Sequence, residues 1–257
     1  MASKKKLSEK KPSSFSSQYE GKIISRKRSW LALMWLVLLA AIVGIIVGLL
    51  LPHLNNNVAQ VTGSYEAYGS AADALKLLPV QSPHTSGYDR KVFGYRTTDD
   101  DGNGCDVRDD VLARDLKNVR FTYVGSCTVK SGILHDPYTG LKINFKRGRK
   151  TSSLVQIDHV VALENAWQSG AWKWSVKKRL SFGNDMLNLL AVQGSANEKK
   201  GSASAAYWLP SNKSFRCSYV ARQIAVKRKY NLSVTSAEKQ EMLSVLHGCS
   251  AQELPKK

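Results

Sequence analysis

Two short stretches of the chain hold the side chains best suited to chemistry. Asp158 and His159 stand together at the end of the apolar run 154–157. Two asparagines, Asn188 and Asn197, follow further along the chain. A neutral imidazole is a competent general base near neutral pH. A single histidine on an apolar strand is more often structural, so the Asp-His pair alone is weak evidence for a site.

The elements around these residues have to bring them together. Residues 154–157 and 187–192 have the composition of β-strands, and residues 197–206 predict a short helix. Adjacent side chains on a strand point to opposite faces, but a bend or bulge at the strand end could let Asp158 and His159 both reach one site. The order strand, strand, helix within a mixed chain predicts an α+β fold.

The arrangement of these motifs resembles a known enzyme family. The order Asp-His, Asn-Leu, Asn-x-x-Lys is similar to the HNH endonuclease superfamily in its His-Asn-Asn form, whose core is a ββα-metal unit. The pieces DGNGCDVR, DPYTG, QIDHVVALENAW, NDMLNLLAV and NEKKG extend the likeness. They resemble secreted bacterial HNH-family proteins related to the C-terminal domain of GmrSD-type modification-dependent restriction endonucleases. The resemblance covers roughly residues 70–250.

The resemblance implies a role for each residue of the set. His159 would be the general base that activates water against the scissile phosphorus. Asp158 and Asn197 would bind one divalent metal. Mg²⁺ is favoured because two oxygen ligands leave it most of its waters, with Mn²⁺ or another ion as the alternative. Asn188 would hold the His159 loop or ring in orientation, and Lys200 would contact phosphate.

The charge of the chain indicates a polyanionic partner. The net charge is +18; residues 1–29 carry nine Lys/Arg and two Glu, which leaves +11 on the remainder. Such a surface attracts nucleic acid, anionic wall polymers or anionic lipid. Together with the nuclease resemblance it favours DNA as the partner, with RNA as the alternative. Arg147, Arg149 and Lys150 form a basic loop that is well placed for a phosphate backbone, unless it is merely solvated. The alternative function is a non-catalytic module that binds nucleic acid or an envelope polymer.

One segment predicts membrane attachment. Residues 30–51 are 22 uncharged residues, enough for a helix that spans a bilayer of about 30 Å. Basic residues just before it place residues 1–29, a predicted disordered tail, in the cytoplasm and the rest outside. Pro52 is expected to end the helix. A cleaved signal peptide, which would give a secreted protein, is the alternative.

The remaining chain divides into a linker at 52–69, a domain at 70–250 and a tail at 251–257. Four cysteines outside the membrane predict disulfides. The nearest-neighbour pairing, Cys105–Cys127 and Cys217–Cys249, is favoured over the other two. Outside the core motif the sequence predicts helices at 70–78, 108–119, 215–230 and 235–246, and short strands at 121–124, 128–129 and 142–145.

An acidic turn before Cys105 has some features of a calcium loop. Asp99, Asp101, Asn103 and Asp110 fall at EF-hand-like offsets, with Gly104 at the sharp turn. The last ligand is the short Asp instead of Glu, and no entering helix precedes the loop. A Ca²⁺ site at Asp99–Asp110 is therefore less favoured than an ordinary Asx turn.

Overall fold

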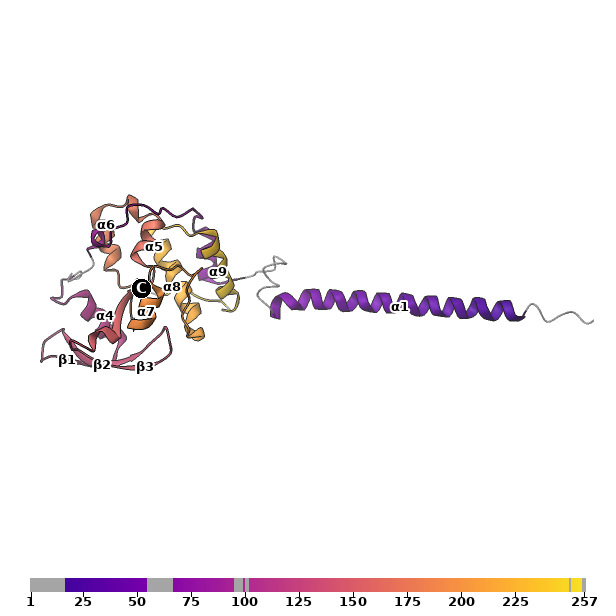
Figure 1. Cartoon of the computed structure of the whole chain (residues 1–257), viewed down its shortest axis with the longest axis horizontal. Coiled ribbons are helices and arrows are strands. Elements are labelled where there is room, and N and C mark those ends of the chain that lie inside the picture. The colour runs from indigo at the N-terminus through magenta and orange to yellow at the C-terminus, as the bar shows by residue number, and fades with distance from the viewer. Residues whose placement is uncertain (1–16, 55–66, 95–98, 100–101, 250, 256–257) are drawn as a thin grey trace, which may run out of the picture. The chain divides into compact units, whose positions relative to one another are not determined.

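The computed structural model of the protein describes residues 17–54, 67–94, 99, 102–249 and 251–255. The chain divides into two compact units, Met1–Ser64 and Tyr65–Lys257, and each is considered by itself (Figure 1).

The first unit contains one long helix, α1 (Ser17–Leu54). Its stretch Trp30–Leu51 is long and apolar enough to cross a membrane, and none of its apolar window is buried, unlike a core helix of a soluble domain. The expectation of disorder is wrong for residues 17–29, which continue the helix; extending a formed helix costs far less than starting one. The helix also runs past Pro52 to Leu54. Residues 1–16 of the predicted tail, and most of the predicted linker, lie outside the described residues.

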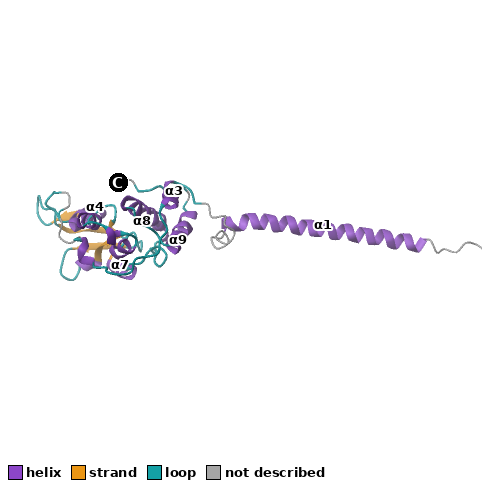
Figure 2. Cartoon of the chain, turned by 90° about the horizontal axis from the view of Figure 1, so that it is seen from above, coloured by secondary structure: helices purple, strands orange, loops and turns teal. Residues whose placement is uncertain are grey.

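The second unit combines short helices with two small sheets (Figure 2). Its α-helices are α3 (Ser70–Leu77), α4 (Val107–Asp115), α5 (Leu163–Gln168), α6 (Val176–Gly183), α7 (Gly194–Lys200), α8 (Arg216–Tyr230) and α9 (Ser236–His247). Short 3-10 helices are η1 (Arg90–Phe93), η2 (Ser152–Leu154), η3 (Ala171–Lys173) and η4 (Lys213–Phe215). The strands are β1 (Lys117–Phe121), β2 (Val129–His135), β3 (Lys142–Lys146), β4 (Val155–His159) and β5 (Leu189–Gln193).

Strands β1, β2 and β3 form an antiparallel sheet in that order. The predicted helix 108–119 is too long, because Leu116 is extended and β1 begins at Lys117. The predicted strand 121–124 is wrong beyond Phe121, since the chain turns there and Gly125 has a positive φ of 86°. The strand expected at 128–129 instead extends to His135 as β2. The favoured disulfide Cys105–Cys127 is present and ties this turn to the segment before α4.

Strands β4 and β5 form a separate antiparallel pair that leads directly into α7. The predicted order of strand, strand and helix is therefore present, although α7 begins at Gly194 and ends at Lys200 instead of covering 197–206. Gly194 is needed where α7 begins, because a Cβ there would collide with the carbonyl oxygen of Ser153. This contact seats the helix against the chain that enters β4.

Three hydrophobic clusters support this arrangement. One joins α4, the inner face of the three-stranded sheet and the β4–β5 pair. Another joins η1, α5, α6 and α8, and a third joins α3, α8 and α9 (Figure 2). The disulfide Cys217–Cys249 links α8 to the end of α9, as favoured.

The predicted C-terminal tail is partly packed. The Gln252 carbonyl accepts a hydrogen bond from Ala71 N at 3.1 Å, and Leu254 N donates to Ser70 Oγ at 2.9 Å. Residues 252–254 therefore belong with the start of α3.

Candidate active site

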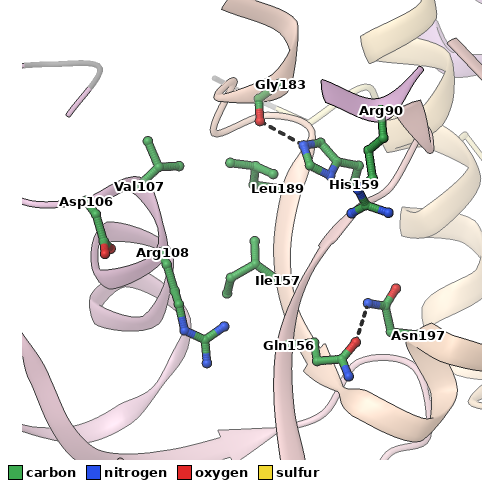
Figure 3. Close-up of a pocket in the computed structure, with 10 residues that line it drawn as sticks. All are labelled: Arg90, Asp106, Val107, Arg108, Gln156, Ile157, His159, Gly183, Leu189 and Asn197. Carbon is green, nitrogen blue, oxygen red and sulfur yellow. Dashed lines mark hydrogen bonds between the residues drawn. The ribbon is translucent and has the colours of Figure 1, made fainter. Parts of the chain in front are cut away.

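Two adjoining cavities lie beside the end of β4, and we call them together the His159 cleft; Figure 3 shows the residues that line the larger one. The larger has a volume of about 410 Å³ and the smaller about 250 Å³. They share the lining residues Arg90, Gln156, Ile157, His159 and Asn197. Asp158 also lines the smaller cavity. The acid, the histidine and the second asparagine of the sequence motif thus meet at one cleft.

The ladder between β4 and β5 is regular up to the pair His159–Leu189. Of the bend or bulge expected at this strand end, the bulge is therefore absent and the bend is present, and the two side chains leave the strand on opposite faces. The chain bends directly after the strand, at Val160 and Val161. Both residues border the smaller cavity because it lies at this strand end.

The imidazole of His159 is held in one tautomer. Its Nε2 lies 2.7 Å from the carbonyl oxygen of Gly183, which can only accept, so Nε2 carries the proton (Figure 3). Burial lowers the pKa of His159 to about 4, the Gly183 carbonyl opposes this shift, and Arg90 and Lys200 add to it. The ring is therefore neutral near pH 7, and Nδ1 is its basic position.

The carboxylate of Asp158 is held by a lysine of α7 and by a tyrosine hydroxyl. Lys200 Nζ lies 2.9 Å from Asp158 Oδ1, and the Tyr138 hydroxyl donates to Oδ2. Burial raises the pKa of Asp158, whereas Lys200 and Tyr138 favour its charged form and lower it. Burial also raises the pKa of Tyr138 well above its ordinary value, so its hydroxyl stays a donor.

Lys200 is enclosed instead of facing solvent. Only 1% of the residue is exposed, and Nζ donates to Asp158 Oδ1 and to the His159 carbonyl oxygen, each at 2.9 Å. This corrects the predicted phosphate contact. The ammonium joins α7 to the end of β4 and compensates the buried carboxylate.

Tyr138 reaches Asp158 from the DPYTG turn. Asp136 Oδ2 accepts from Thr139 N at 2.9 Å, and Asp136 Oδ1 accepts from Gln193 N at 2.9 Å. Gly140 closes the turn with a φ of 77°, a conformation that favours glycine. The turn is thereby fixed to the end of β5, with the Tyr138 ring among Trp208 and Tyr219.

Asn188 holds the bend that follows His159. Its Oδ1 accepts from Val161 N at 2.8 Å, its Nδ2 donates to the Val161 carbonyl at 3.2 Å, and its own carbonyl accepts from Val160 N at 2.8 Å. The residue is fully buried. These contacts match the loop-holding role that the resemblance implies.

Asn197 differs from the other nearby asparagines because it lines the cleft. Its Nδ2 donates to Gln156 Oε1 at 2.8 Å, and Gln156 Nε2 donates to Glu198 Oε1 at 3.0 Å. This orients the amide so that Oδ1 points away from Gln156 (Figure 3). Asn184, by contrast, is buried and donates to the Leu180 carbonyl within α6.

Two arginines of the cleft have no signal in the sequence motif. Arg90 lines both cavities, and its guanidinium lies beside His159 (Figure 3). It is carried by η1, which the buried Phe93 anchors against Phe182 of α6. Arg108 lines the larger cavity from α4 and donates to the Ser152 and Val155 carbonyls at 3.2 and 2.9 Å.

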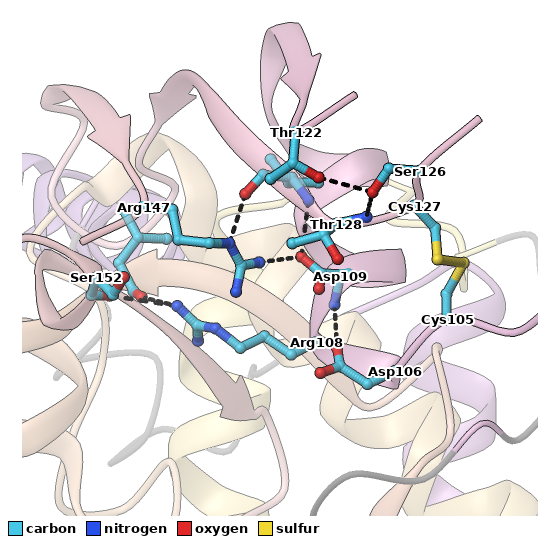
Figure 4. Close-up of polar contacts among 12 residues, drawn as sticks. Cys105, Asp106, Arg108, Asp109, Thr122, Ser126, Cys127, Thr128, Arg147 and Ser152 are labelled. Carbon is cyan, nitrogen blue, oxygen red and sulfur yellow. Dashed lines mark hydrogen bonds and ion pairs between the residues drawn. A yellow bond between two sulfur atoms is a disulfide. The ribbon is translucent and has the colours of Figure 1, made fainter. Parts of the chain in front are cut away.

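The residues of the predicted basic loop differ in their contacts. Arg147 is paired with Asp109 of α4 and donates through Nε to the Val129 carbonyl at 2.7 Å (Figure 4). Its predicted substrate contact is corrected to a structural one. Arg149 and Lys150 are exposed.

The acidic turn before α4 is held by hydrogen bonds from its own backbone N–H groups to the Asp99 carboxylate. Asp99 Oδ1 accepts from Gly102 N and Asn103 N, and Asp99 Oδ2 accepts from Gly104 N at 2.8 Å. These are the contacts of an Asx-type turn. Asp101, the second ligand of the predicted calcium loop, lies outside the described residues.

Comparisons with known proteins agree with the sequence motif. The family described as "GmrSD restriction endonucleases, C-terminal domain" matches residues 106–245. An "Uncharacterized secreted protein" of Arthroderma benhamiae is 41% identical over 182 residues, which are 70% of this chain and 83% of the relative. No solved structure matches the chain at a significant level. The chain belongs to the family of GmrSD restriction endonuclease C-terminal domains.

Proposed function

We propose that the protein is a metal-dependent endonuclease that hydrolyses phosphodiester bonds, with β4, β5 and α7 as its ββα-metal core. The observation that carries the proposal is that Asp158, His159 and Asn197 line one cavity at the end of β4. Membership of an endonuclease-related family supports it. A +11 charge outside residues 1–29 suits a polyanionic substrate.

His159 is the proposed general base. The hydrogen bond from Nε2 to the Gly183 carbonyl leaves the Nδ1 lone pair as the proton acceptor. The lowered pKa keeps the ring unprotonated at neutral pH. A water molecule in the cleft would give its proton to Nδ1 as its oxygen attacks phosphorus. Asn188 and Gly183 hold the loop and the ring in place for this step.

The donor set of the cleft fits a hard divalent cation. Asp158 offers a carboxylate whose oxygens each keep a second lone pair beside the bonds from Lys200 and Tyr138. Asn197 offers an amide oxygen, Oδ1, that is turned away from Gln156. Two oxygen donors leave most positions to water and phosphate oxygens, which suits Mg²⁺, with Mn²⁺ as the alternative. When bound, the cation would polarise a phosphoryl oxygen and stabilise the leaving oxygen. Among the described residues no group of three or more His, Cys, Asp or Glu side chains is arranged to hold a metal ion.

Arg90 is the proposed phosphate-binding residue inside the cleft. It is exposed, borders both cavities, and stands beside the proposed base (Figure 3). A guanidinium pairs with phosphate oxygens through two parallel hydrogen bonds, which orients the phosphorus as well as binding it. Arg108 adds positive charge on the opposite, α4 side of the larger cavity.

We propose DNA as the substrate and the outer side of a membrane as the location. Two disulfides support an oxidising compartment, and the apolar stretch Trp30–Leu51 supports an uncleaved anchor or a signal. The basic residues before Trp30 favour a cytoplasmic N-terminus for an anchored form. The secreted relative is compatible with either form.

The test is a cleavage assay with the full chain purified in detergent. Supercoiled plasmid, single-stranded DNA and RNA are each incubated with Mg²⁺, with Mn²⁺, or with excess chelator. We expect cleavage of DNA that needs a divalent cation and stops with chelator. Binding of DNA without cleavage under every metal and substrate would overturn the proposal and favour the non-catalytic binding module.

A further inference from the structure

The outer face of the three-stranded sheet carries a cluster of cations that the cleft does not use. The strand register places Lys117 opposite Ile133, Arg120 opposite Ser131, and Lys146 opposite Ser131 from the other side. His135 is paired with Lys142. Side chains of paired residues share a face. Four cations therefore lie on one face, and we call Lys117, Arg120, Lys142 and Lys146 the basic face.

This face is turned away from the core. Leu134 and Phe145 point to the opposite side, where they are buried against α4 and the β4–β5 pair. Lys117, Arg120, Lys142 and Lys146 are all exposed. The inner side is thus filled by the domain, and the outer side is open in this unit.

The basic face has no acidic counterpart. The three strands contain five Lys or Arg residues and no Asp or Glu. Within the described part of the chain, the four side chains of the basic face take part in none of the ion pairs. Elsewhere Arg114, Arg147, Lys200 and Lys227 each pair with a carboxylate. Unpaired cations collected on one face repel one another, and a polyanion would relieve this repulsion.

The size of the basic face matches a short length of nucleic-acid backbone. Lys142 and Lys146 stand four residues apart on β3, which is about 14 Å along a strand. Three strands at about 4.8 Å spacing add roughly 10 Å across. At one phosphate per about 3.4 Å of each DNA strand, 14 Å spans about four phosphates.

A path of positive charge connects this face to the cleft. Strand β3 ends at Lys146, and the exposed Arg149 and Lys150 follow. The same loop reaches Ser152, whose carbonyl accepts from Arg108, a residue of the cleft wall. A backbone that leaves the cleft along this loop would arrive at Lys146.

We propose that the basic face binds the phosphate backbone of nucleic acid outside the cleft and so holds the substrate of the proposed nuclease. This inference rests on the proposed function for the identity of the polyanion. The contact is to phosphates, so it adds affinity without base preference.

The test compares two variants of equal charge in the full chain. The first replaces Lys117, Arg120, Lys142 and Lys146 by Gln. The matched control replaces four exposed cations scattered over α3, α6, η4 and α8 by Gln: Lys76, Lys177, Lys213 and Arg228. Binding of a fluorescent DNA duplex is titrated in chelator over a range of salt, so that cleavage plays no part.

We expect the basic-face variant to lose at least about tenfold in affinity. The magnitude of the slope of log K against log salt concentration should decrease by about 3 to 4, because each neutralised phosphate contributes about 0.9. The control variant should show a clearly smaller loss of affinity and a clearly smaller change of the salt slope. Equal losses in the two variants, or no binding by the wild type, would overturn the inference. If the basic-face variant binds DNA as the wild type does but no longer binds anionic lipid vesicles, the inference is overturned as well, and the basic face binds a membrane surface instead. If DNA binding depends on the basic face but the chain cuts no substrate, the inference stands and the proposed nuclease function is rejected.

Discussion

Lys200 Nζ and Asp158 Oδ1 form an ion pair of 2.9 Å between two buried side chains, directly beneath the end of β4. The pair ties the helix that carries Asn197 to the strand that carries His159. It also keeps the carboxylate beside the smaller cavity. The contact therefore stabilises the fold at the place where the metal site is proposed.

Removal of the ammonium should be costly for folding. In Lys200→Met the Asp158 carboxylate stays buried without its cation, and we expect the free energy of unfolding to fall by about 3–5 kcal/mol. Urea unfolding followed by circular dichroism measures this. Lys199→Met, at the exposed neighbouring position of α7, should change it by less than about 0.5 kcal/mol. Similar stability of the two variants would contradict the compensating role of Lys200.

Much of this arrangement could be predicted from residue types and spacing. The apolar run before Asp158, the second apolar run after Asn188 and the Asn-x-x-Lys motif predict two strands and a helix, and β4, β5 and α7 follow that order. The nearest-neighbour cysteine pairing was also confirmed. These features have local signals, either an apolar pattern or a short spacing.

Other features depend on contacts between distant segments. Arg90 enters the cleft because Phe93 packs on α6, and no motif marks it. Lys200 and Arg147 belong to the residue types that are usually exposed, so their carboxylate partners became evident only with the fold. The early end of α4 follows from the pairing of β1 with β2, which outweighs the helical pattern beyond Leu116.

His159 should remain neutral through the range in which an ordinary histidine titrates, about pH 5 to 8. Its pKa in the folded chain is about 4, below the ordinary 6.5. Between these values the unfolded state binds more protons, so the free energy of unfolding falls as pH decreases from 6.5 toward 4. The loss attributable to His159 is about 3 kcal/mol. NMR titration of the ring in chelator should show no midpoint above pH 5, and a midpoint near 6.5 would contradict its burial.

Asn188→Ala should loosen the bend after His159. It leaves the Val161 N–H and carbonyl without their buried partner, and we expect a loss of about 2–4 kcal/mol in the free energy of unfolding. Cleavage should also fall at temperatures where the variant is folded, since the base loses its support. Gln240→Ala, at an exposed amide of α9, is the control. Full activity in a folded Asn188→Ala protein would refute the positioning role.

Arg90→Ala should lower kcat/KM by about 10- to 100-fold, because a charge-assisted contact to phosphate contributes about 1.5–3 kcal/mol. Arg90→Lys should recover part of this, as it keeps the charge without the bidentate geometry. Lys91→Ala, at the next exposed position of η1, should stay within about twofold of wild type. Steady-state kinetics on a fluorescent oligonucleotide decides this. Equal effects at positions 90 and 91 would rule out a specific contact by Arg90.

The role of His159 as general base is measured by the single-turnover cleavage rate of supercoiled plasmid by His159→Ala in Mg²⁺. Circular dichroism should first show that the variant is folded, and DNA binding in chelator should match that of the wild type. The proposed role of His159 predicts a rate at least about a hundredfold below wild type, as expected for loss of a general base. A folded His159→Ala protein that cleaves at the wild-type rate would contradict it.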